Sequence, residues 1–599
     1  MSGNRKPVAV LAAMALAMPA TAAAQLEQDV TGVARAASSL SIPHATGVVR
    51  IDGVLDDPIW SDALNVAVDI ETNPRENEPA GVQTTAYLVE DGARLLIAFD
   101  ARDSEPRSIR AYLRDRDTAY NDDFVGVVLD TFNDQRRAFE FFANPLGVQM
   151  DLIQDDVNRT EDDSWDAIWE SAGSITDSGF VVEMAIPFSQ LRFSRVAGER
   201  IWGIDVLRFR PRKDRVRISN NPLDRSRNCY VCQFAEFRGF ADAQSRKALE
   251  IVPTLTSART DRRADPASST LVNGDFDTEL GVSVRWGITP DLTGDLALNP
   301  DFSHVEADIP QLAENTQFAL EYPETRPFFL EGADYFASPL QAIFTRTVAD
   351  PDVGAKLTGR SSANTFGVVA TEDAVTNLLF PGPFRSLTDS LEQSNRSLIG
   401  RYTRGFGESS TIGALFTRRS GDGYENTVAG IDGRYHITDQ HNVHFQYLDS
   451  DTVYPAGVAT EFAQPEGDFG GDALRVKYEF SSRDWYAEVD HLEIDPGFRA
   501  DAGFITRVDF DQQNIELNRI WHGEERNWWN QMRAGGLWSR TQDGAGRVLA
   551  QTFEPFFSFQ GPLQSFVQIG GGPSKSFGKA KCSIWKAYFC SVRSARGAD

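Results

Sequence analysis

The 599-residue sequence carries 59 lysine and arginine side chains against 86 aspartate and glutamate, a formal charge of −27 with an isoelectric point near 4.7. A surface this acidic repels phosphate backbones, so nucleic acid is excluded as a partner. The length predicts at least two domains, and only four cysteines exclude a disulfide-dense scaffold.

Residues 1–24 have the layout of a cleavable signal peptide. Arg5 and Lys6 form a positive start, residues 8–18 are apolar, and small residues at 22–24 precede Gln25. The apolar run is too short to cross a bilayer as a helix. We therefore expect export and leave residues 1–24 out of the fold. The alternative, an unstructured tail, would not need the apolar run.

Residues 42–245 have the pattern of short strands separated by turns. The segment 84–103 is predicted to be a hairpin that turns at Asp91 and Gly92, and further strand pairs follow at 122–152 and 178–212. Many short strands with little helix are typical of two antiparallel sheets packed face to face. The predicted fold of this domain is an antiparallel β-sandwich.

Motifs at both ends of this domain resemble carbohydrate-binding modules of family 9. The residues that carry the likeness are Ile51, Asp52, Gly53, Leu55, Asp56, Trp60, Glu183, Ile186, Pro187 and Leu191. The resemblance covers residues 42–245. It implies a lectin-like β-sandwich that holds sugars between aromatic faces and that in many relatives contains calcium.

Sugar binding requires exposed aromatic rings that stack on the apolar faces of pyranoses, with polar groups beside them. We expect these from Trp165 and Trp169, together with Tyr120 beside Asp122 and Asp123. The expected ligand is an oligosaccharide or a polysaccharide. The alternative for either tryptophan is a place in the core, since a spacing of four also suits the anchor of a local turn.

Clustered carboxylates in 154–166 are the hard oxygen ligands that calcium prefers, and Asp155, Asp156, Asp162 and Asp163 are the candidate ligands. The alternative is a solvated acidic loop, because no EF-hand spacing is present. Paired carboxylates would also serve a glycosidase. No phosphate-binding loop, HExxH or GxSxG motif occurs, and the seven histidines lack metal-ligand spacing.

Cys229 and Cys232 form an isolated CxxC pair. A zinc site would need four ligands, and no second pair lies nearby. The strands around the pair do not form the βαβ setting of a thioredoxin-like motif. In an oxidising compartment we expect a disulfide that staples a loop, with free thiols as the alternative.

Residues 246–570 change to longer alternating segments, for example 280–286, 443–447 and 474–480. Segments of about 10 residues that alternate apolar and polar, with aromatic residues near their ends, are typical of an outer-membrane β-barrel. A soluble sandwich or a propeller is the competing interpretation, but soluble strands average only about 5–6 residues. The predicted fold class is therefore all-β: an antiparallel sandwich followed by an antiparallel outer-membrane barrel that contacts lipid.

The segment 299–336, NPDFSHVEADIPQLAENTQFALEYPETRPFFLEGADYF, resembles a family of proteins that pair a family 9-like module with a barrel domain of unknown function, DUF5916. Segments 126–151, 354–360 and 408–423 are similar to the same family. The resemblance implies no chemistry. With its prolines the segment 299–336 cannot be one strand, so its aromatic residues fill the barrel, present a ligand surface or contact the sandwich.

Residues 571–599 depart from the pattern of a closing barrel strand, since they turn basic and contain Cys582 and Cys590. We interpret them as an atypical tail that follows a truncation or frameshift near 570–575, which would leave the barrel without closing strands.

Three functions remain open on the sequence. The first is a carbohydrate-binding outer-membrane barrel protein that captures or takes up glycans at the envelope, with the sandwich on either side of the membrane. The second is a hydrolase of O-glycosyl bonds, or a protein associated with one, in xylan-like carbohydrate catabolism. The third is a periplasmic adaptor whose sandwich binds an envelope protein. We favour binding over catalysis, and no catalytic residue is assigned.

Overall fold

The computed structural model describes residues 40–195, 198–243, 249–263, 270–300, 317–361, 363–407, 409–524 and 527–576. The chain divides into two units, residues 1–40 and 41–599, and the second forms one compact body that contains all the features below. Strand β1 (Leu40–Ser41) spans the boundary. The predicted signal peptide, residues 301–316 and most of the predicted tail lie outside the described residues.

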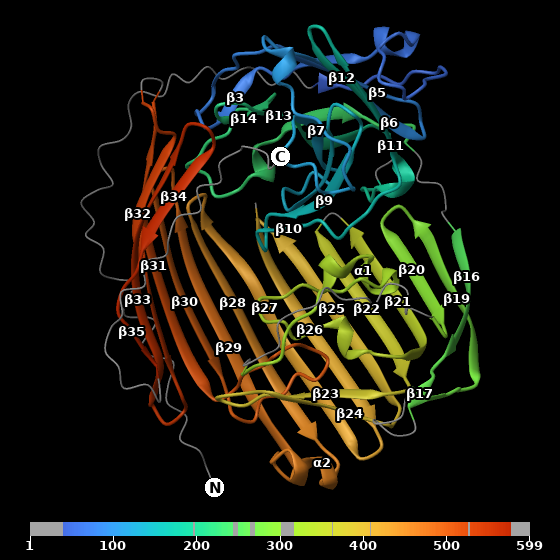
Figure 1. Ribbon diagram of the computed structural model, residues 1–599, viewed down its shortest axis with the longest axis vertical. Coiled ribbons are helices and arrows are strands. Elements are labelled where there is room, and N and C mark those ends of the chain that lie inside the picture. The colour runs from blue at the N-terminus through green and yellow to red at the C-terminus, as the bar shows by residue number, and fades with distance from the viewer. Residues whose placement is uncertain are drawn as a thin grey trace. The chain divides into compact units, whose positions relative to one another are not determined.

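The first part of this body consists of two antiparallel sheets (Figure 1). Sheet A contains β3 (Ile70–Asn73), β4 (Glu78–Pro79), β7 (Phe124–Asp130), β8 (Arg137–Ala143), β9 (Gln149–Asp155), β10 (Thr160–Asp162), β13 (Arg200–Pro211), β14 (Arg215–Ser219) and β15 (Ala235–Gly239). Sheet B contains β2 (Leu64–Ala67), β5 (Thr84–Glu90), β6 (Arg94–Arg102), β11 (Glu170–Thr176) and β12 (Gly179–Pro187). Short 3-10 helices join them: η1 (Pro58–Ser61), η2 (Pro106–Ser108), η3 (Phe188–Gln190) and η4 (Val231–Gln233).

Sheets A and B pack face to face. Arg208 on β13 is fully buried and donates to the hydroxyl of Thr84 on β5 (2.8 Å), while its guanidinium lies 5.2 Å from the ring of Phe180 on β12. All seven residues of β7 are buried. The predicted hairpin is also present, since β5 and β6 pair in antiparallel register around Gly92, whose φ of +83° suits glycine.

The second part is a 16-stranded antiparallel sheet in the described residues, and its strands lie side by side in a curved layer (Figure 1). Its strands are β16 (Leu249–Arg259), β19 (Phe276–Thr289), β20 (Leu292–Leu298), β21 (Pro351–Ser361), β22 (Asn364–Asp373), β25 (Asn395–Phe406), β26 (Ser410–Gly421), β27 (Tyr424–Thr438), β28 (His441–Val453), β29 (Asp468–Ser481), β30 (Trp485–Ile494), β31 (Phe510–His522), β32 (Gln531–Gln542), β33 (Val548–Gly561), β34 (Ser565–Gly570) and β35 (Ser574–Ser576). Small pairs are β17 (Arg262–Arg263) with β18 (Leu271–Val272) and β23 (Thr376–Phe380) with β24 (Leu387–Leu391).

The predicted fold class is confirmed: the chain is all-β, with an antiparallel sandwich followed by a large antiparallel sheet of the barrel type. Strands β16 and β34 stand at the two ends of the strand order, and the described residues show no pairing between them. No helix in the described ranges has the length and hydropathy to cross a membrane.

The large sheet has an exposed apolar face and an enclosed polar face. Along β25, Leu398 and Tyr402 are 44% and 43% exposed, whereas Ser397 and Arg401 are buried. Successive side chains on a strand point to opposite faces. On other strands of the same sheet the exposed apolar residues include Ile412, Phe416, Ile431, Val489, Ile515 and Leu517. The buried polar residues include Arg419, Asn426, Asp432, Gln446, Glu479 and Asn518.

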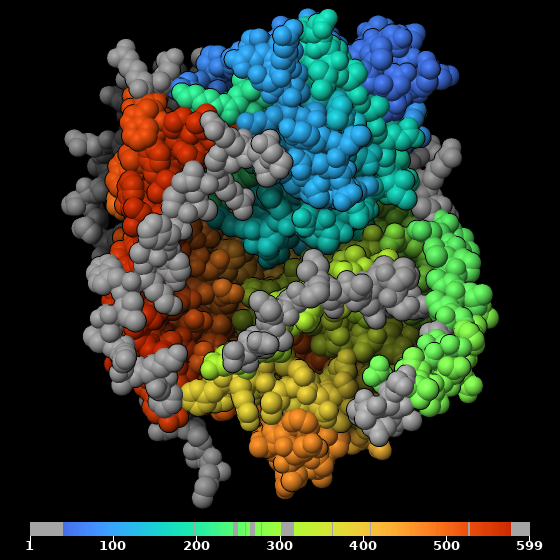
Figure 2. All heavy atoms as spheres, in the orientation of Figure 1, coloured from blue at the N-terminus to red at the C-terminus, as the bar shows by residue number. Residues whose placement is uncertain are grey.

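The described part of the chain between β20 and β21, residues 317–350, packs against the enclosed face of this sheet. Within 317–350 it forms α1 (Pro327–Leu330), η5 (Ala333–Phe336) and η6 (Thr345–Thr347); a second short helix, α2 (Ala456–Glu461), follows β28. Phe328 packs against Gly354 of β21 and Phe336 against Gly367 of β22, where an added Cβ would lie 2.9 and 2.5 Å from the respective rings. The segment is seen in yellow-green in the hollow of the sheet in Figure 2. We call residues 317–350 the plug segment.

The sandwich is joined to turns at one end of the large sheet. Arg227 pairs with Asp439 in the turn between β27 and β28 (3.1 Å), and the backbone N–H of Asn228 donates to the carbonyl of Asp439 (2.7 Å). Arg483, in the turn between β29 and β30, pairs with Glu76 (2.6 Å). The sandwich therefore lies over this end of the strands (Figure 1).

Candidate functional site

A cavity of about 220 Å³ lies where β8 and β9 of the sandwich approach the plug segment. Its apolar wall comes from Phe139, Ile153 and Trp165. The polar groups that line it include Asp166, Gln190, Arg192, Arg285, Glu331 and Asp334. An aromatic wall faced by a few hydrogen-bonding groups is the usual composition of a small-molecule site.

Trp165 is half-buried and is held by two phenylalanines of β8. Its ring centroid lies 5.1 Å from that of Phe139 and 5.8 Å from that of Phe141. Phe139 and Phe141 share one face of the strand because side chains two residues apart point the same way. The indole is thus fixed at the cavity wall and keeps exposed surface on which a sugar ring could stack.

Trp169 lies in a different environment, although it is only four residues away. It is 6% exposed, and its ring meets the edge of Phe141 at 5.5 Å. Its carbonyl accepts a hydrogen bond from the side chain of Gln149 (2.8 Å). The structure brings Trp165 but not Trp169 to the cavity, and Trp169 occupies the core position that was the alternative for either tryptophan.

Tyr120, Asp122 and Asp123 do not belong to the described residues that line this cavity. The half-buried ring of Tyr120 packs edge-on to Phe124. Asp122 is buried and accepts from the backbone N–H of Tyr112 (2.9 Å), and buried Asp123 accepts from that of Arg110 (2.8 Å). The two carboxylates hold the loop before β7, and their part in sugar binding stays a prediction.

The four carboxylates predicted as calcium ligands are directed to separate partners. Asp155 pairs with Arg137 (2.9 Å), Asp156 accepts from two backbone N–H groups (2.8 Å each), and Asp162 accepts from Ser164. Asp163 is exposed. These four do not form one of the metal-capable clusters found among the described residues.

A carboxylate cluster that the sequence spacing did not reveal adjoins the cavity. Oxygens of Asp117, Asp151 and Asp166 lie within 4.8 Å of one another. Arg116 enters the cluster, with Nε 2.8 Å from Asp166 and Nη2 bonded to Asp151. Burial, with the charge of Asp151, raises the pKa of Asp117 to about 6. One arginine therefore offsets only part of the charge of three carboxylates in this corner of the cavity, and the raised pKa of Asp117 lets that carboxyl take up a proton near pH 6.

The plug segment supplies the opposite wall. The ring of Tyr335 lies 5.5 Å from the guanidinium of Arg137 and 5.0 Å from that of Arg192, both of the sandwich. Arg137 pairs with Asp334 (2.6 Å) and Arg192 with Glu331 (2.8 Å). Of the three alternatives for the aromatic residues of 299–336, burial inside the sheet and contact with the sandwich both apply to the described part.

The loop that contains the CxxC pair binds a buried carboxylate of the sandwich, and its Asn228 also bonds to Asp439 and Glu479 of the large sheet. Cys229 and Cys232 are joined by a disulfide. The backbone N–H groups of Tyr230 and Val231 inside this loop are those that bind Asp156 (2.8 Å each). The disulfide thus closes the loop that orients this buried carboxylate.

Several residues of the cavity were missed from the sequence, among them Phe139, Gln190, Arg192 and Tyr335. The alternation of phenylalanines in 138–142 was a usable signal, since it places Phe139 and Phe141 on one face. Arg192 and Tyr335 gave no such signal, because they meet across a large separation along the chain.

Two family models match the chain. Residues 51–222 match the family described as "Carbohydrate family 9 binding domain-like", and residues 252–370 match "Domain of unknown function (DUF5916)". No curated protein matches the chain.

Among solved structures, a family 9 module from Caldicellulosiruptor kristjanssonii in complex with cellotriose is 16% identical, covering 33% of this chain and 92% of that one with a TM-score of 0.24. OccAB2 from Acinetobacter baumannii is 9% identical over 76% of this chain and 92% of that one, with a TM-score of 0.28. OpdK from Pseudomonas aeruginosa with vanillate is 8% identical over 76% of this chain and 93% of that one, with a TM-score of 0.26. These scores are too low to bear on the fold. The two family matches show that the chain combines a carbohydrate family 9 binding domain-like region with a DUF5916 region.

Proposed function

We propose that this protein binds carbohydrate at the bacterial outer membrane, with the sugar held in the cavity beside Trp165. The observation that carries the proposal is the half-buried ring of Trp165, backed by Phe139 and Phe141, in a cavity whose other walls are polar. The match of residues 51–222 to a carbohydrate-binding family supports it.

The chemistry of the cavity suits a neutral or weakly charged sugar. The C–H face of a pyranose would stack on Trp165, and Gln190, Arg192 and Asp166 would hydrogen-bond its hydroxyl groups. Pockets for drug-sized ligands measure roughly 300–1,000 Å³. A volume of about 220 Å³ therefore holds about one sugar ring, which favours recognition of a chain end or of a short oligosaccharide.

The large sheet supports the membrane part of the proposal. Its exposed face is apolar and its enclosed face polar, the reverse of a soluble protein and the arrangement of a barrel surrounded by lipid. The start of the sequence, with its predicted signal peptide, supports export. Because the cavity is bounded by the sandwich and by the plug segment, a bound sugar would contact both, which supports a role in glycan capture or uptake.

The test measures binding by the full-length protein in detergent micelles, by isothermal titration with a panel of gluco- and xylo-oligosaccharides. Trp165→Ala should weaken binding by about thirtyfold or more, because a central tryptophan typically contributes about 2 kcal/mol or more. Trp165→Phe should retain part of the affinity. Tyr112→Ala is the matched control, since Tyr112 is a 58% exposed aromatic residue of the sandwich outside the cavity.

If the wild type and Trp165→Ala bound the saccharides with equal affinity, the sugar-binding site would not be this cavity. Failure of the wild type to bind any saccharide would contradict the proposal and favour the adaptor function. The same samples are analysed for shortened oligosaccharides, and their release would favour the hydrolase instead.

A further inference from the structure

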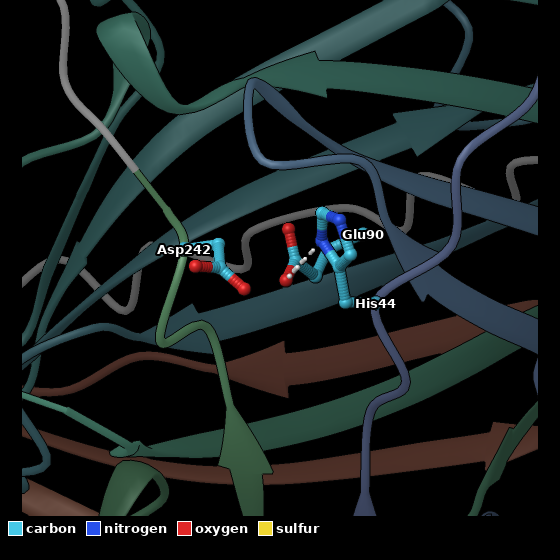
Figure 3. Close-up of side chains that lie close together, drawn as sticks. All are labelled: His44, Glu90 and Asp242. Atoms are coloured by element: carbon cyan, nitrogen blue, oxygen red, sulfur yellow. Dashed lines mark hydrogen bonds and ion pairs between the residues drawn. The ribbon is translucent and has the colours of Figure 1, made fainter.

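Three potential metal ligands converge at the edge of the sandwich, away from the Trp165 cavity. His44 precedes η1, Glu90 ends β5 and Asp242 follows β15, and Figure 3 shows their side chains directed toward one another. One donor atom from each lies within 4.8 Å of the others. Nδ1 of His44 is 3.0 Å from Oε1 of Glu90.

The backbone fixes two of these side chains opposite each other. His44 and Glu90 form a parallel bridge, in which Glu90 donates to the carbonyl of Pro43 (3.0 Å) and accepts from Ala45 (2.9 Å). The spacing between the imidazole and the carboxylate is therefore set before any ligand arrives, which lowers the entropic cost of binding one.

The third side chain follows an anchored turn. The ring of Phe240 stacks on that of Trp202 with centroids 3.9 Å apart, and the N–H of Ala243 donates to the carbonyl of Phe240 (3.2 Å). Asp242 lies within this turn, so its backbone is held by the core on which Phe240 packs.

Two carboxylates meet here against one cation of the described residues, Arg200, whose charge acts on Glu90, so the site keeps a net negative charge while His44 is neutral. The side chain of Glu90 is 2% exposed, and a buried carboxylate is costly unless a positive charge or hydrogen bonds compensate it. The backbone N–H of Gly92 donates to Oε2 (2.5 Å). The partner of Oε1 is an imidazole that carries a positive charge only when protonated. A divalent cation would neutralise Glu90 and Asp242 together and accept the lone pair of a neutral His44.

The donor set identifies the kind of cation. Calcium and magnesium take oxygen ligands, whereas zinc binds imidazole nitrogen together with carboxylate oxygen. Zinc bonds of about 2.0–2.2 Å place neighbouring donors of a tetrahedral site roughly 3.3–3.6 Å apart. The 3.0 Å between Nδ1 of His44 and Oε1 of Glu90 is a hydrogen-bond distance, so the two donors would separate by a few tenths of an ångström to take the ion between them. His44 and Asp242 are exposed, so water can complete the coordination.

We propose that His44, Glu90 and Asp242 form a zinc site. The ion would link the segment at the start of the sandwich, through His44, to the segment that follows β15, through Asp242. Its role would be structural. The ordinary alternative is an ion pair between a protonated His44 and Glu90, with Asp242 uninvolved.

The test uses untagged full-length protein in detergent, stripped with a chelator and titrated with zinc chloride against a chromophoric zinc chelator. The wild type should take up one equivalent at pH 7.5. His44→Ala and Asp242→Asn, both at exposed positions that tolerate substitution, should each weaken zinc binding by at least about tenfold, the loss that even outer-shell partners of a metal cause. Asp69→Asn, at another exposed carboxylate of the sandwich, should bind as the wild type does.

Hydrogen exchange supplies the second readout. Zinc should protect the backbone amides of residues 44 and 45 and of 240–243 in the wild type and in Asp69→Asn, but not in His44→Ala. A wild type that takes up no zinc would overturn the proposal. Zinc uptake that both ligand substitutions leave unchanged would overturn it too. An affinity lowered by His44→Ala but not by Asp242→Asn would exclude the three-ligand site.

Discussion

The indole Nε1 of Trp60 donates a 2.9 Å hydrogen bond to Oε1 of Glu183. This bond links the start of the sandwich to strand β12. The other oxygen of Glu183 accepts from the backbone N–H groups of Asp52 (2.9 Å) and Gly53 (2.8 Å). The carboxylate is fully buried. The two motifs that resemble family 9 modules are therefore the two halves of one interaction, which fixes the first loop of the sandwich on sheet B.

Replacing Glu183 with alanine should destabilise the sandwich strongly. Three donors would lose their acceptor, and each buried donor left unpaired costs about 1–3 kcal/mol. We expect a loss of about 3 kcal/mol or more in the free energy of unfolding. Urea-dependent pulse proteolysis of the full-length protein measures it. Glu170→Ala, at an exposed position of β11, is the control and should change stability by less than about 0.5 kcal/mol.

Glu140 on β8 should make the sandwich less stable as the pH rises. Burial, followed by the charge of Glu161, raises the pKa of Glu140 from 4.5 to about 8. The native state therefore binds more protons than the unfolded state between these values, and stability falls as pH increases through this window. Glu140→Gln should match the wild type near pH 4.5 and exceed it at pH 9.

The comparison is made by thermal unfolding of the two proteins across this pH range. Glu161→Gln should remove part of the pH dependence, since Glu161 contributes to the shift. A wild type and a Glu140→Gln variant with parallel pH profiles would show that Glu140 titrates normally in the folded protein.

A positive charge on the exposed face of the large sheet should impair insertion into lipid. Leu398 on β25 is 44% exposed and lies on the apolar face. Arginine at a lipid-facing position near the bilayer midplane costs roughly 2–4 kcal/mol. We expect Leu398→Arg to lower the fraction folded into lipid vesicles, measured by the heat-dependent shift in gel mobility. The control is Ile175→Arg, a 48% exposed position of the sandwich, which should fold into vesicles as the wild type does.

Inside the sheet, Arg401 and Asp432 form a two-pronged ion pair, with Nη1 to Oδ1 and Nη2 to Oδ2 both at 2.7 Å. Both side chains are almost fully buried. Breaking one partner of a buried pair costs about 3–5 kcal/mol, because the other charge is left uncompensated, whereas replacing both is far milder. Arg401→Met should therefore lower the midpoint of thermal unfolding more than the double variant Arg401→Met/Asp432→Leu. The opposite order would indicate that water already compensates the charges.

The strands of the large sheet could be predicted because their signal is local. In 474–480 and 443–447 every second residue is apolar, and both segments lie in strands, β29 and β28. The hairpin at Asp91 and Gly92 was predictable for the same reason, since a short turn sequence separates two apolar runs.

The candidate site was only partly predictable. Trp165 was a candidate because it lies among polar residues that suit sugar binding, but the spacing of four to Trp169 does not show that one ring lines a cavity and the other packs in the core. Arg116 pairs with Asp151, and Arg192 pairs with Glu331 of the plug segment. The partners in each pair are far apart in the sequence and come together only in the folded protein. The cluster of His44, Glu90 and Asp242 likewise could not be predicted from ligand spacing. These residues are distant in the sequence and are brought together only by the arrangement of the strands.

The plug segment connects the large sheet to the sandwich. It lies between β20 and β21, which are neighbours in the sheet, with Leu298 and Val353 as register partners. On its other side it is bonded to the sandwich through the ion pairs of Arg137 with Asp334 and of Arg192 with Glu331. Separation of the sandwich from this segment would therefore have to break both ion pairs, so the segment couples the position of the sandwich to that of the sheet.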